Sequence, residues 1–146
     1  MVSFLNIAAA VSIGLMIGVE LAVWVFINPT LRRLDDQSRA QAVQLFARRL
    51  GTAMPFWYIA NFLFLITAWV VLRHAWPLAA AVGIWLAVIV LTLIFLVPIN
   101  NRLARQQGHE STAWAQSEHE RWDRMHRARV MMLCVAMVLF LVGAGF

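Results

Sequence analysis

One carboxylic acid, Glu20, lies inside a long run of apolar residues and is the residue of this sequence with the clearest chemical meaning. If the run crosses a membrane, an ionised carboxylate within it is costly unless it faces a polar partner or water, and such acids commonly serve binding or proton transfer. Asn61 is expected at a similar depth in a second apolar run, counting about 1.5 Å per helical residue. The two side chains are expected either to share a functional site or to form a hydrogen-bonded pair that only joins two helices.

A second candidate group lies where the third apolar run ends and the fourth begins. His119, Trp122, His126 and Arg129 follow one another at spacings that place them on one face of a helix. Imidazole suits proton transfer, and amide and guanidinium groups suit stabilisation of a developing oxyanion. A water-exposed helical face would explain the same charges. The sequence predicts two catalytic residues, Glu20 and His126, and five substrate-binding residues, Asn61, Asn100, Asn101, Trp122 and Arg129.

A metal site is a third hypothesis, because Glu20, His119 and His126 together would supply two imidazoles and one carboxylate, the set typical of non-haem iron. The HExxH pattern of zinc proteases is absent, since His119 and Glu120 are followed by Asp123 at the position of the second histidine. Haem or a non-haem metal therefore stays open as a cofactor, and neither is required.

The composition places these residues in a membrane protein. Of the 146 residues, 62% are hydrophobic and 13% are charged, and the mean hydropathy is +0.75, outside the usual mix of soluble domains. Each of four apolar runs is long enough, at about 18 residues or more, to cross a hydrocarbon layer. The sequence predicts one transmembrane domain over residues 1–146, with spans at about 4–27, 54–72, 76–97 and 129–146.

The arginines predict the orientation of these spans. All 12 basic residues are arginine; five lie in the connection 28–53, six lie at 98–129, and Arg73 alone lies between the second and third spans. Because cytoplasmic loops are rich in Arg and Lys, both long loops, 28–53 and 98–128, are expected in the cytoplasm and both termini outside, in a multi-pass protein of the cytoplasmic membrane. The arginines flank apolar runs, so we expect contact with membrane lipid and no binding of nucleic acid.

Both long connections contain helical patterns. Asp35 and Asp36 suit a helix start, apolar residues recur at helical spacing to Leu50, and Gly51 suits a helix end. This pattern predicts a short helix that lies on the membrane surface between spans one and two. Nothing after Ser111 would break a helix before span four, so helix four is expected to project into the cytoplasm. The predicted fold class is therefore an all-α bundle of four transmembrane helices with an interfacial helix and this extension.

A resemblance to a known family rests on short motifs. The stretch PINNR at 98–102, Glu20 in the first span, Met54 and Pro55 at the start of the second, and Trp122, His126 and Arg129 before the fourth resemble the anthrone-oxygenase-like membrane proteins, small four-helix proteins that are largely uncharacterised. The resemblance covers nearly the whole chain. It implies a four-helix membrane bundle and, in the fungal members, oxygenation of an anthrone to an anthraquinone. It also implies that Asn100, Asn101, Trp122, His126 and Arg129 lie in a pocket beside Glu20.

Two classes of function follow from these observations. The first is an oxidoreductase for a flat aromatic or quinone-like substrate that enters from the membrane, with Glu20 or His126 as the base and the reaction in the cytoplasmic half of the bundle. The second is a non-catalytic membrane protein that binds a lipid, quinone, haem or metal, or an accessory subunit of a larger membrane complex. We expect a hydrophobic small molecule as a partner beside membrane lipid, and four helices without a soluble domain leave a homo-oligomer open.

Overall fold

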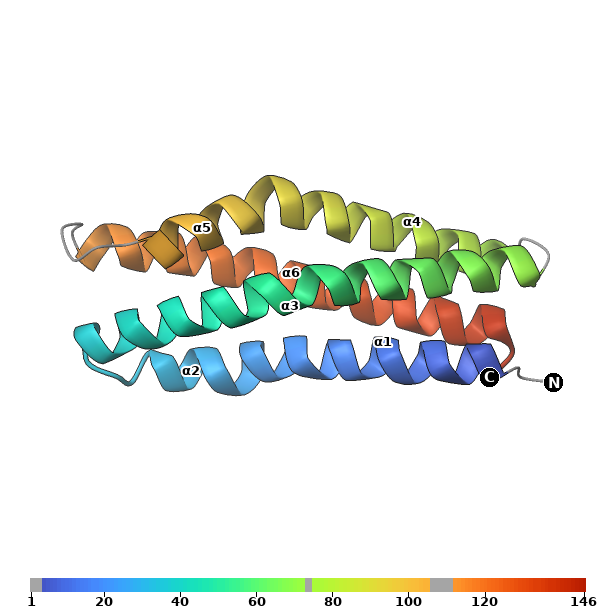
Figure 1. The fold of residues 1–146 in the computed structure, drawn as a ribbon, viewed down its shortest axis with the longest axis horizontal. Coiled ribbons are helices and arrows are strands. Elements are labelled where there is room, and N and C mark those ends of the chain that lie inside the picture. Colours follow the sequence, from blue (N-terminus) through green and yellow to red (C-terminus); the bar gives the residue numbers. More distant parts are fainter. Residues whose placement is uncertain (1–3, 73–74, 106–111) are drawn as a thin grey trace.

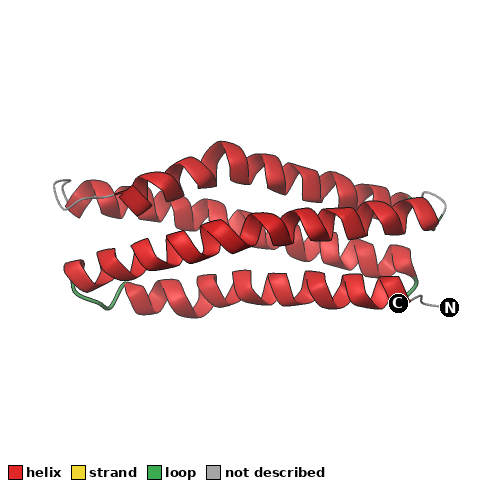
Figure 2. Cartoon of the chain, viewed as in Figure 1, coloured by secondary structure: helices red, strands yellow, loops and turns green. Residues whose placement is uncertain are grey.

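The chain forms four long antiparallel helices that lie side by side (Figure 1) in a computed structural model describing residues 4–72, 75–105 and 112–146. The first comprises α1 (Phe4–Ala22), the π-helical segment η1 (Val23–Ile27) and α2 (Asn28–Leu31) without interruption. The second is α3 (Asp36–Val71). The third comprises α4 (Trp76–Leu91), the π-helical segment η2 (Thr92–Leu96) and α5 (Val97–Arg105), and the fourth is α6 (Thr112–Ala144). In the described ranges all other residues lie in short connections or at the chain end (Figure 2).

All four helices are long and apolar enough to cross a membrane, and the spans run from Phe4 to Leu31, Asp36 to Val71, Trp76 to Arg102, and Glu120 to Ala144. The protein is therefore a multi-pass, all-helical membrane protein, as the sequence predicts. In hydrocarbon a helix is favoured because it satisfies its backbone hydrogen bonds within one segment. Each helix packs mainly on two neighbours: α1 packs on α3 and α6, and α4 packs on α3 and α6.

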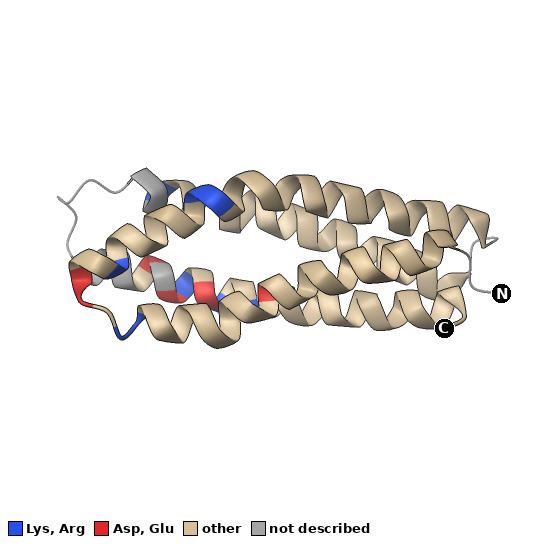
Figure 3. Cartoon of the chain, turned by 60° about the horizontal axis from the view of Figure 1, so that its bottom comes forward, with Lys and Arg blue, Asp and Glu red and all other residues tan. Residues whose placement is uncertain are grey.

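The helices overrun the predicted spans at one end of the bundle. At about 1.5 Å per residue, the 36 residues of α3 extend about 54 Å, well beyond a hydrocarbon layer of about 30 Å. The excess lies at the end opposite both chain termini, where the charged residues gather (Figure 3). We call this end, formed by α2, α5 and the first halves of α3 and α6, the polar end. Helix four has the predicted extension, and the assignment of the polar end to the cytoplasm stays a prediction.

The interfacial helix is not a separate element, which corrects one detail of the predicted fold. Residues 36–50 are helical, but α3 continues through Gly51 and Pro55 without a break. Proline removes one hydrogen bond and crowds the carbonyl of the residue four positions earlier, which here is Gly51. The first half of α3 packs along α5 instead of lying flat on the membrane surface. At its start, the Asp35 carboxylate accepts a hydrogen bond from the Ser38 backbone N–H at 3.0 Å, which lowers the pKa of Asp35 below its ordinary value.

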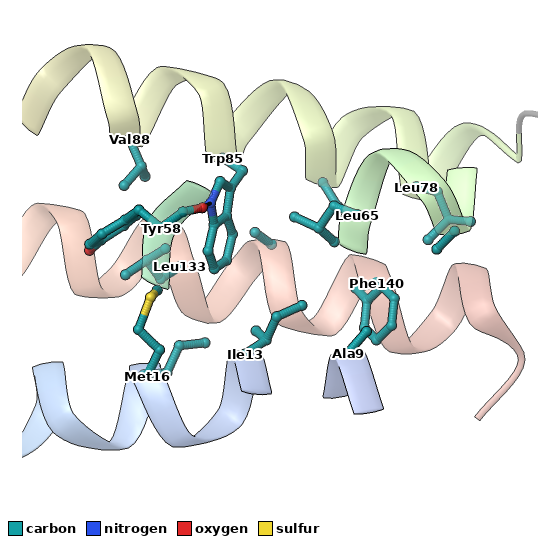
Figure 4. Packing of buried hydrophobic residues seen from close by; sticks show 14 of the residues in the cluster. Ala9, Ile13, Met16, Tyr58, Leu65, Leu78, Trp85, Val88, Leu133 and Phe140 are labelled. Atoms are coloured by element: carbon teal, nitrogen blue, oxygen red, sulfur yellow. Dashed lines mark hydrogen bonds between the residues drawn. The ribbon is translucent and has the colours of Figure 1, made fainter. Parts of the chain in front are cut away.

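The apolar core fills the bundle between the polar end and the chain termini. Trp85, Leu133 and Phe140 have no exposed side-chain surface and lie between the four helices (Figure 4). Near the termini, Gly143 of α6 lets this helix approach α4 closely, because a Cβ atom built there would lie 2.7 Å from Leu78 Cγ and 3.2 Å from the Leu78 backbone nitrogen.

We expect Gly143→Ala to destabilise the protein by about 1–3 kcal/mol, because the added methyl group overpacks a helix contact that includes backbone. Gly83→Ala is the matched control, since nothing lies within 4 Å of a Cβ atom built there, and it should be neutral or stabilising by up to about 1 kcal/mol. Equilibrium unfolding in detergent measures both. A Gly143→Ala protein as stable as the Gly83→Ala protein would contradict the close approach.

Candidate functional site

Glu20 is buried at the end of α1, with 2% of its surface exposed, and its carboxylate is the centre of a polar cluster. Arg129 Nη2 of α6 donates to Glu20 Oε2 at 2.6 Å, and the Tyr58 hydroxyl of α3 donates to Glu20 Oε1 at 2.8 Å. Arg129 balances the charge of the carboxylate, and both oxygens are hydrogen-bonded, as a buried carboxylate requires. Three helices therefore meet at one ion pair inside the bundle.

His126 lies one helical turn before Arg129, and its surroundings define its tautomer. Its Nε2 lies 3.0 Å from the backbone carbonyl oxygen of Glu20, which can only accept, so Nε2 carries the proton. Its Nδ1 lies 2.9 Å from Arg129 Nη2, which can only donate, and 3.2 Å from Glu20 Oε2, which can only accept. We assign Nδ1 as the acceptor, because its contact with Arg129 is the shorter of the two. The imidazole is neutral in this arrangement, and the indole of Trp122 stacks on it with ring centroids 4.7 Å apart. Both nitrogens of His126 are thus engaged within the cluster.

Tyr58 is held by the apolar core. The Trp85 indole donates to the backbone carbonyl of Tyr58 at 3.1 Å, and the two rings lie 6.0 Å apart between centroids. The Tyr58 hydroxyl points away from Trp85 toward the polar end (Figure 4). The Arg129 guanidinium carbon lies 5.7 Å from the centre of the Tyr58 ring, a cation–π distance. The tyrosine thus holds both members of the ion pair.

A partly open cavity of about 230 Å³ lies beside the cluster. Its polar lining includes Glu20, Tyr58, His126 and Arg129, whereas most of its wall is aliphatic. Arg129 Nε is buried and has no hydrogen-bond partner among the described residues, although Nη1 lies 3.5 Å from the Thr92 hydroxyl. An unpartnered buried donor is costly. Arg129 is part of the cavity lining, so its guanidinium group borders the space that a bound molecule would occupy.

Backbone irregularities surround this cavity. The π-helical segments η1 and η2 both contribute to its wall, as does Pro55 of α3. The helix formed by α4, η2 and α5 bends where α4 ends (Figure 1). A π-helical turn carries an extra residue and is frequent at functional sites. Three of the four long helices are therefore irregular where they border the cavity. This irregularity explains why their side chains do not fill it.

A second polar group fastens the polar end. Asp123 of α6 is 5% exposed and accepts hydrogen bonds from Asn28 Nδ2 at 2.8 Å and Arg32 Nη2 at 2.9 Å. Arg127 Nε lies 3.7 Å from the same carboxylate. This group joins the end of α2 to α6 one turn before His126. It holds in place the helices that carry Glu20 and His126.

The structure gathers some of the predicted site residues and separates others. Asn100, Trp122, His126, Arg129 and Glu20 all line the cavity. Their roles as catalytic or binding residues stay predictions.

Asn61 does not meet Glu20, contrary to the sequence-based expectation. Its side chain accepts from the Ser12 hydroxyl at 2.7 Å and donates to Met16 Sδ at 3.3 Å. Ser12 precedes Glu20 by eight residues, about 12 Å along the helix, so Asn61 lies deeper in the bundle than the cavity. Tyr58, one turn earlier in α3 and with a longer side chain, reaches the carboxylate instead.

Asn101 also departs from the prediction, since it is exposed and is not part of the cavity lining. Asn100 faces inward and donates a long hydrogen bond, 3.4 Å, to the backbone carbonyl of Ala47. Consecutive residues of a helix point about 100° apart, and here Asn100 is the one that borders the cavity.

The predicted metal set is tested only in part. Glu20 Oε2 and His126 Nδ1 lie 3.2 Å apart, while the side chain of His119 lies outside the described residues. Within the described part of the chain, no group of three His, Cys, Asp or Glu side chains could hold a metal ion. A metal ion shared by Glu20 and His126 would have to displace the Arg129 guanidinium, so this pair fits a metal poorly as it stands.

Tyr58 and Thr92 were not predicted as site residues. Tyr58 is the sole tyrosine of the chain and lies in an apolar span. A buried tyrosine hydroxyl needs a polar partner, which is the signal that would have paired it with Glu20. Thr92 donates to the Val88 carbonyl at 2.8 Å, as threonines in membrane helices commonly do, and nothing in the sequence distinguishes it.

Fold and site together define a small four-helix membrane protein with a buried carboxylate–guanidinium pair beside an apolar cavity. The sequence matches the family model described as anthrone oxygenase over residues 42–139. The chain therefore belongs to the anthrone oxygenase family. The matched segment contains Tyr58, Asn100, His126 and Arg129, whereas Glu20 precedes it. No curated protein and no solved structure matches the chain.

Proposed function

We propose that this protein is an oxygenase-type oxidoreductase that converts an anthrone-like aromatic ketone to the corresponding quinone in the cavity beside Glu20. The observation that carries the proposal is the Glu20–Arg129 pair in the wall of an otherwise aliphatic cavity. The aliphatic wall suits a flat apolar ring system, and the guanidinium of Arg129 suits its ketone oxygen. Membership in the family supports the same reaction.

Glu20 is the better candidate for the base, because its two oxygens retain lone pairs after accepting from Tyr58 and Arg129. In the assigned tautomer His126 has none to spare, since Nε2 carries the proton and Nδ1 accepts from Arg129. We therefore assign proton removal to Glu20 and the orientation of Arg129 to His126. In this assignment Arg129 stabilises the enolate oxygen that forms when the proton leaves.

The proposed reaction balances with dioxygen as the oxidant. Glu20 takes a proton from the CH₂ group opposite the ketone, and the resulting anion gives electrons to dioxygen and forms a C–O bond. Return of the proton gives a hydroperoxide. Loss of water from it leaves the second carbonyl, so one substrate and one dioxygen give one quinone and one water.

Purified protein in lipid nanodiscs, mixed with anthrone, tests this function. Wild type should consume one dioxygen per quinone formed, followed with an oxygen electrode and by quinone absorbance, faster than empty nanodiscs. Val23→Phe is the control variant, because Val23 is 5% exposed and lines the cavity, and the larger side chain should exclude the substrate. Anthrone binding without oxygen uptake above the empty nanodiscs would refute the enzyme and favour the non-catalytic binding protein.

A further inference from the structure

Several residues line the cavity and are also exposed on the outside of the bundle. Ile59 of α3 is 55% exposed and Leu93 of η2 is 61% exposed, and both contribute to the cavity wall. Pro55, one turn before Ile59, is likewise exposed and lines the cavity. A residue that borders both an internal space and the outside lies at its mouth. Gly51, one turn before Pro55, meets the same criterion. The cavity therefore opens along α3, and between α3 and η2 its mouth is formed by Pro55, Ile59 and Leu93.

The mouth lies within the apolar part of the bundle. Ile59 follows Tyr58 directly, and both belong to the second span, while Leu93 belongs to the third. The outward neighbours of the mouth are apolar as well: Phe56 is 74% exposed, and Leu63 and Ile94 are each 58% exposed. Large apolar surface of this kind is stable only against hydrocarbon. This apolar rim suits contact with lipid.

The side of the cavity toward the polar end is bordered by polar and aromatic side chains, and the exposed Gly51 lies there too. Asn100 bridges α5 to the Ala47 carbonyl of α3, and Gly51 beside it leaves room for the asparagine, since a Cβ atom there would lie 3.3 Å from Asn100 Nδ2. The stacked rings of Trp122 and His126 stand on the α6 side. Water-soluble molecules would have to pass these groups, whereas a lipid-dissolved molecule meets two flexible aliphatic side chains.

We propose that ligands of this cavity are neutral, flat, apolar molecules that enter laterally from the bilayer between Ile59 and Leu93. The proposal rests on the proposed function only for the kind of molecule that the cavity takes. The irregular backbones on either side of the mouth explain how it can widen. Pro55 removes one hydrogen bond from α3, and η2 lacks the regular pattern of an α-helix, so neither helix is held as rigidly as a continuous α-helix there.

A labelling rate tests the route without any turnover. Val23→Cys places a thiol in the cavity wall, with Cys134 changed to serine so that it is the only thiol in the protein. The protein in nanodiscs at pH 8.5 is treated with N-phenylmaleimide, a neutral lipid-soluble reagent, or with a sulfonated maleimide that stays in water. Intact-mass spectrometry follows the modification, and the denatured protein confirms that the thiol is free. Because every variant shares the same thiol, its ionisation cancels in the comparison.

Leu93→Trp, at the mouth, should slow labelling by N-phenylmaleimide about tenfold or more, as expected when a bulky group obstructs an access route. Ile94→Trp is the matched control, since Ile94 has nearly the same exposure as Leu93 but does not line the cavity, and its rate should stay close to the parent rate. The sulfonated reagent should react much more slowly than the neutral one. Equal rates for the two tryptophan variants, equal rates for the two reagents, or no labelling of the folded parent would each overturn the proposal. Failure of anthrone oxidation would leave it intact.

Discussion

Replacing Arg129 by leucine is expected to destabilise the protein by about 3–5 kcal/mol, the cost of leaving a buried charge without its partner. The guanidinium is the sole cation bonded to Glu20 within the described structure, and only 10% of its side chain and 3% of that of Glu20 are exposed. Without it, the carboxylate must take up a proton or remain ionised in an apolar surrounding, and either costs free energy. Equilibrium unfolding in mixed detergent micelles, followed by circular dichroism, measures the difference from wild type.

Arg127→Leu is the matched control for this change. Arg127 lies two residues earlier in α6, is about half exposed at its side chain, and lies 3.7 Å from the Asp123 carboxylate. Exposed ion pairs contribute about 0–1 kcal/mol, so its loss should be small. The double variant Glu20→Gln/Arg129→Leu should recover part of the stability lost in Arg129→Leu, because it removes the uncompensated charge. No recovery would mean that Arg129 stabilises the bundle by packing rather than by pairing with Glu20.

The fold could be predicted well from the sequence because a lipid bilayer restricts the secondary structure of the segments that cross it. Long apolar runs in a bilayer must be helices, so four runs give four spans. The sequence predicted the α6 part of the site for a related reason. Trp122, His126 and Arg129 lie on one unbroken α-helix, so counting residues places them on one face.

Counting residues gives wrong positions where a helix is irregular. It also fails when the depths of residues on two different helices are compared. The segment η2 lies within the third apolar run and before Asn100, and an extra residue in a turn rotates everything beyond it by about 100°. Which asparagine faces inward therefore cannot be read from the sequence. The prediction places Asn61 at the depth of Glu20 by counting from a helix start near Met54. In the structure α3 begins at Asp36 and continues through Pro55, so this count does not give the depth of Asn61.

The predicted surface helix shows a further limit of local patterns. The spacing of apolar residues between Asp36 and Leu50 gives the helix but not its position. The same apolar stripe can lie on a lipid surface or against another helix, and here α5 provides the other helix. Tertiary packing decides which surface this stripe contacts, and the local spacing of apolar residues does not predict it.

Glu20→Gln is expected to lower the rate of anthrone oxidation by about 10²–10⁴-fold, the usual contribution of a positioned general base. Glutamine keeps the shape of the side chain and can still accept from Arg129, but it cannot take a proton from the substrate. The loss should appear in kcat, with little change in KM, because the aliphatic wall that binds the substrate is unchanged. Initial rates of quinone formation measure it, and unfolding in detergent verifies that the variant is folded.

Glu118→Gln provides the control, because Glu118 pairs with Arg102 at the polar end and does not line the cavity; its activity should equal that of wild type. Deuterium at the reacting CH₂ group should slow the wild-type enzyme if proton removal limits the rate. Wild-type activity in a folded Glu20→Gln protein would show that the carboxylate joins three helices without taking the proton. His126 would then be the remaining base, and it could act only after Arg129 released its Nδ1.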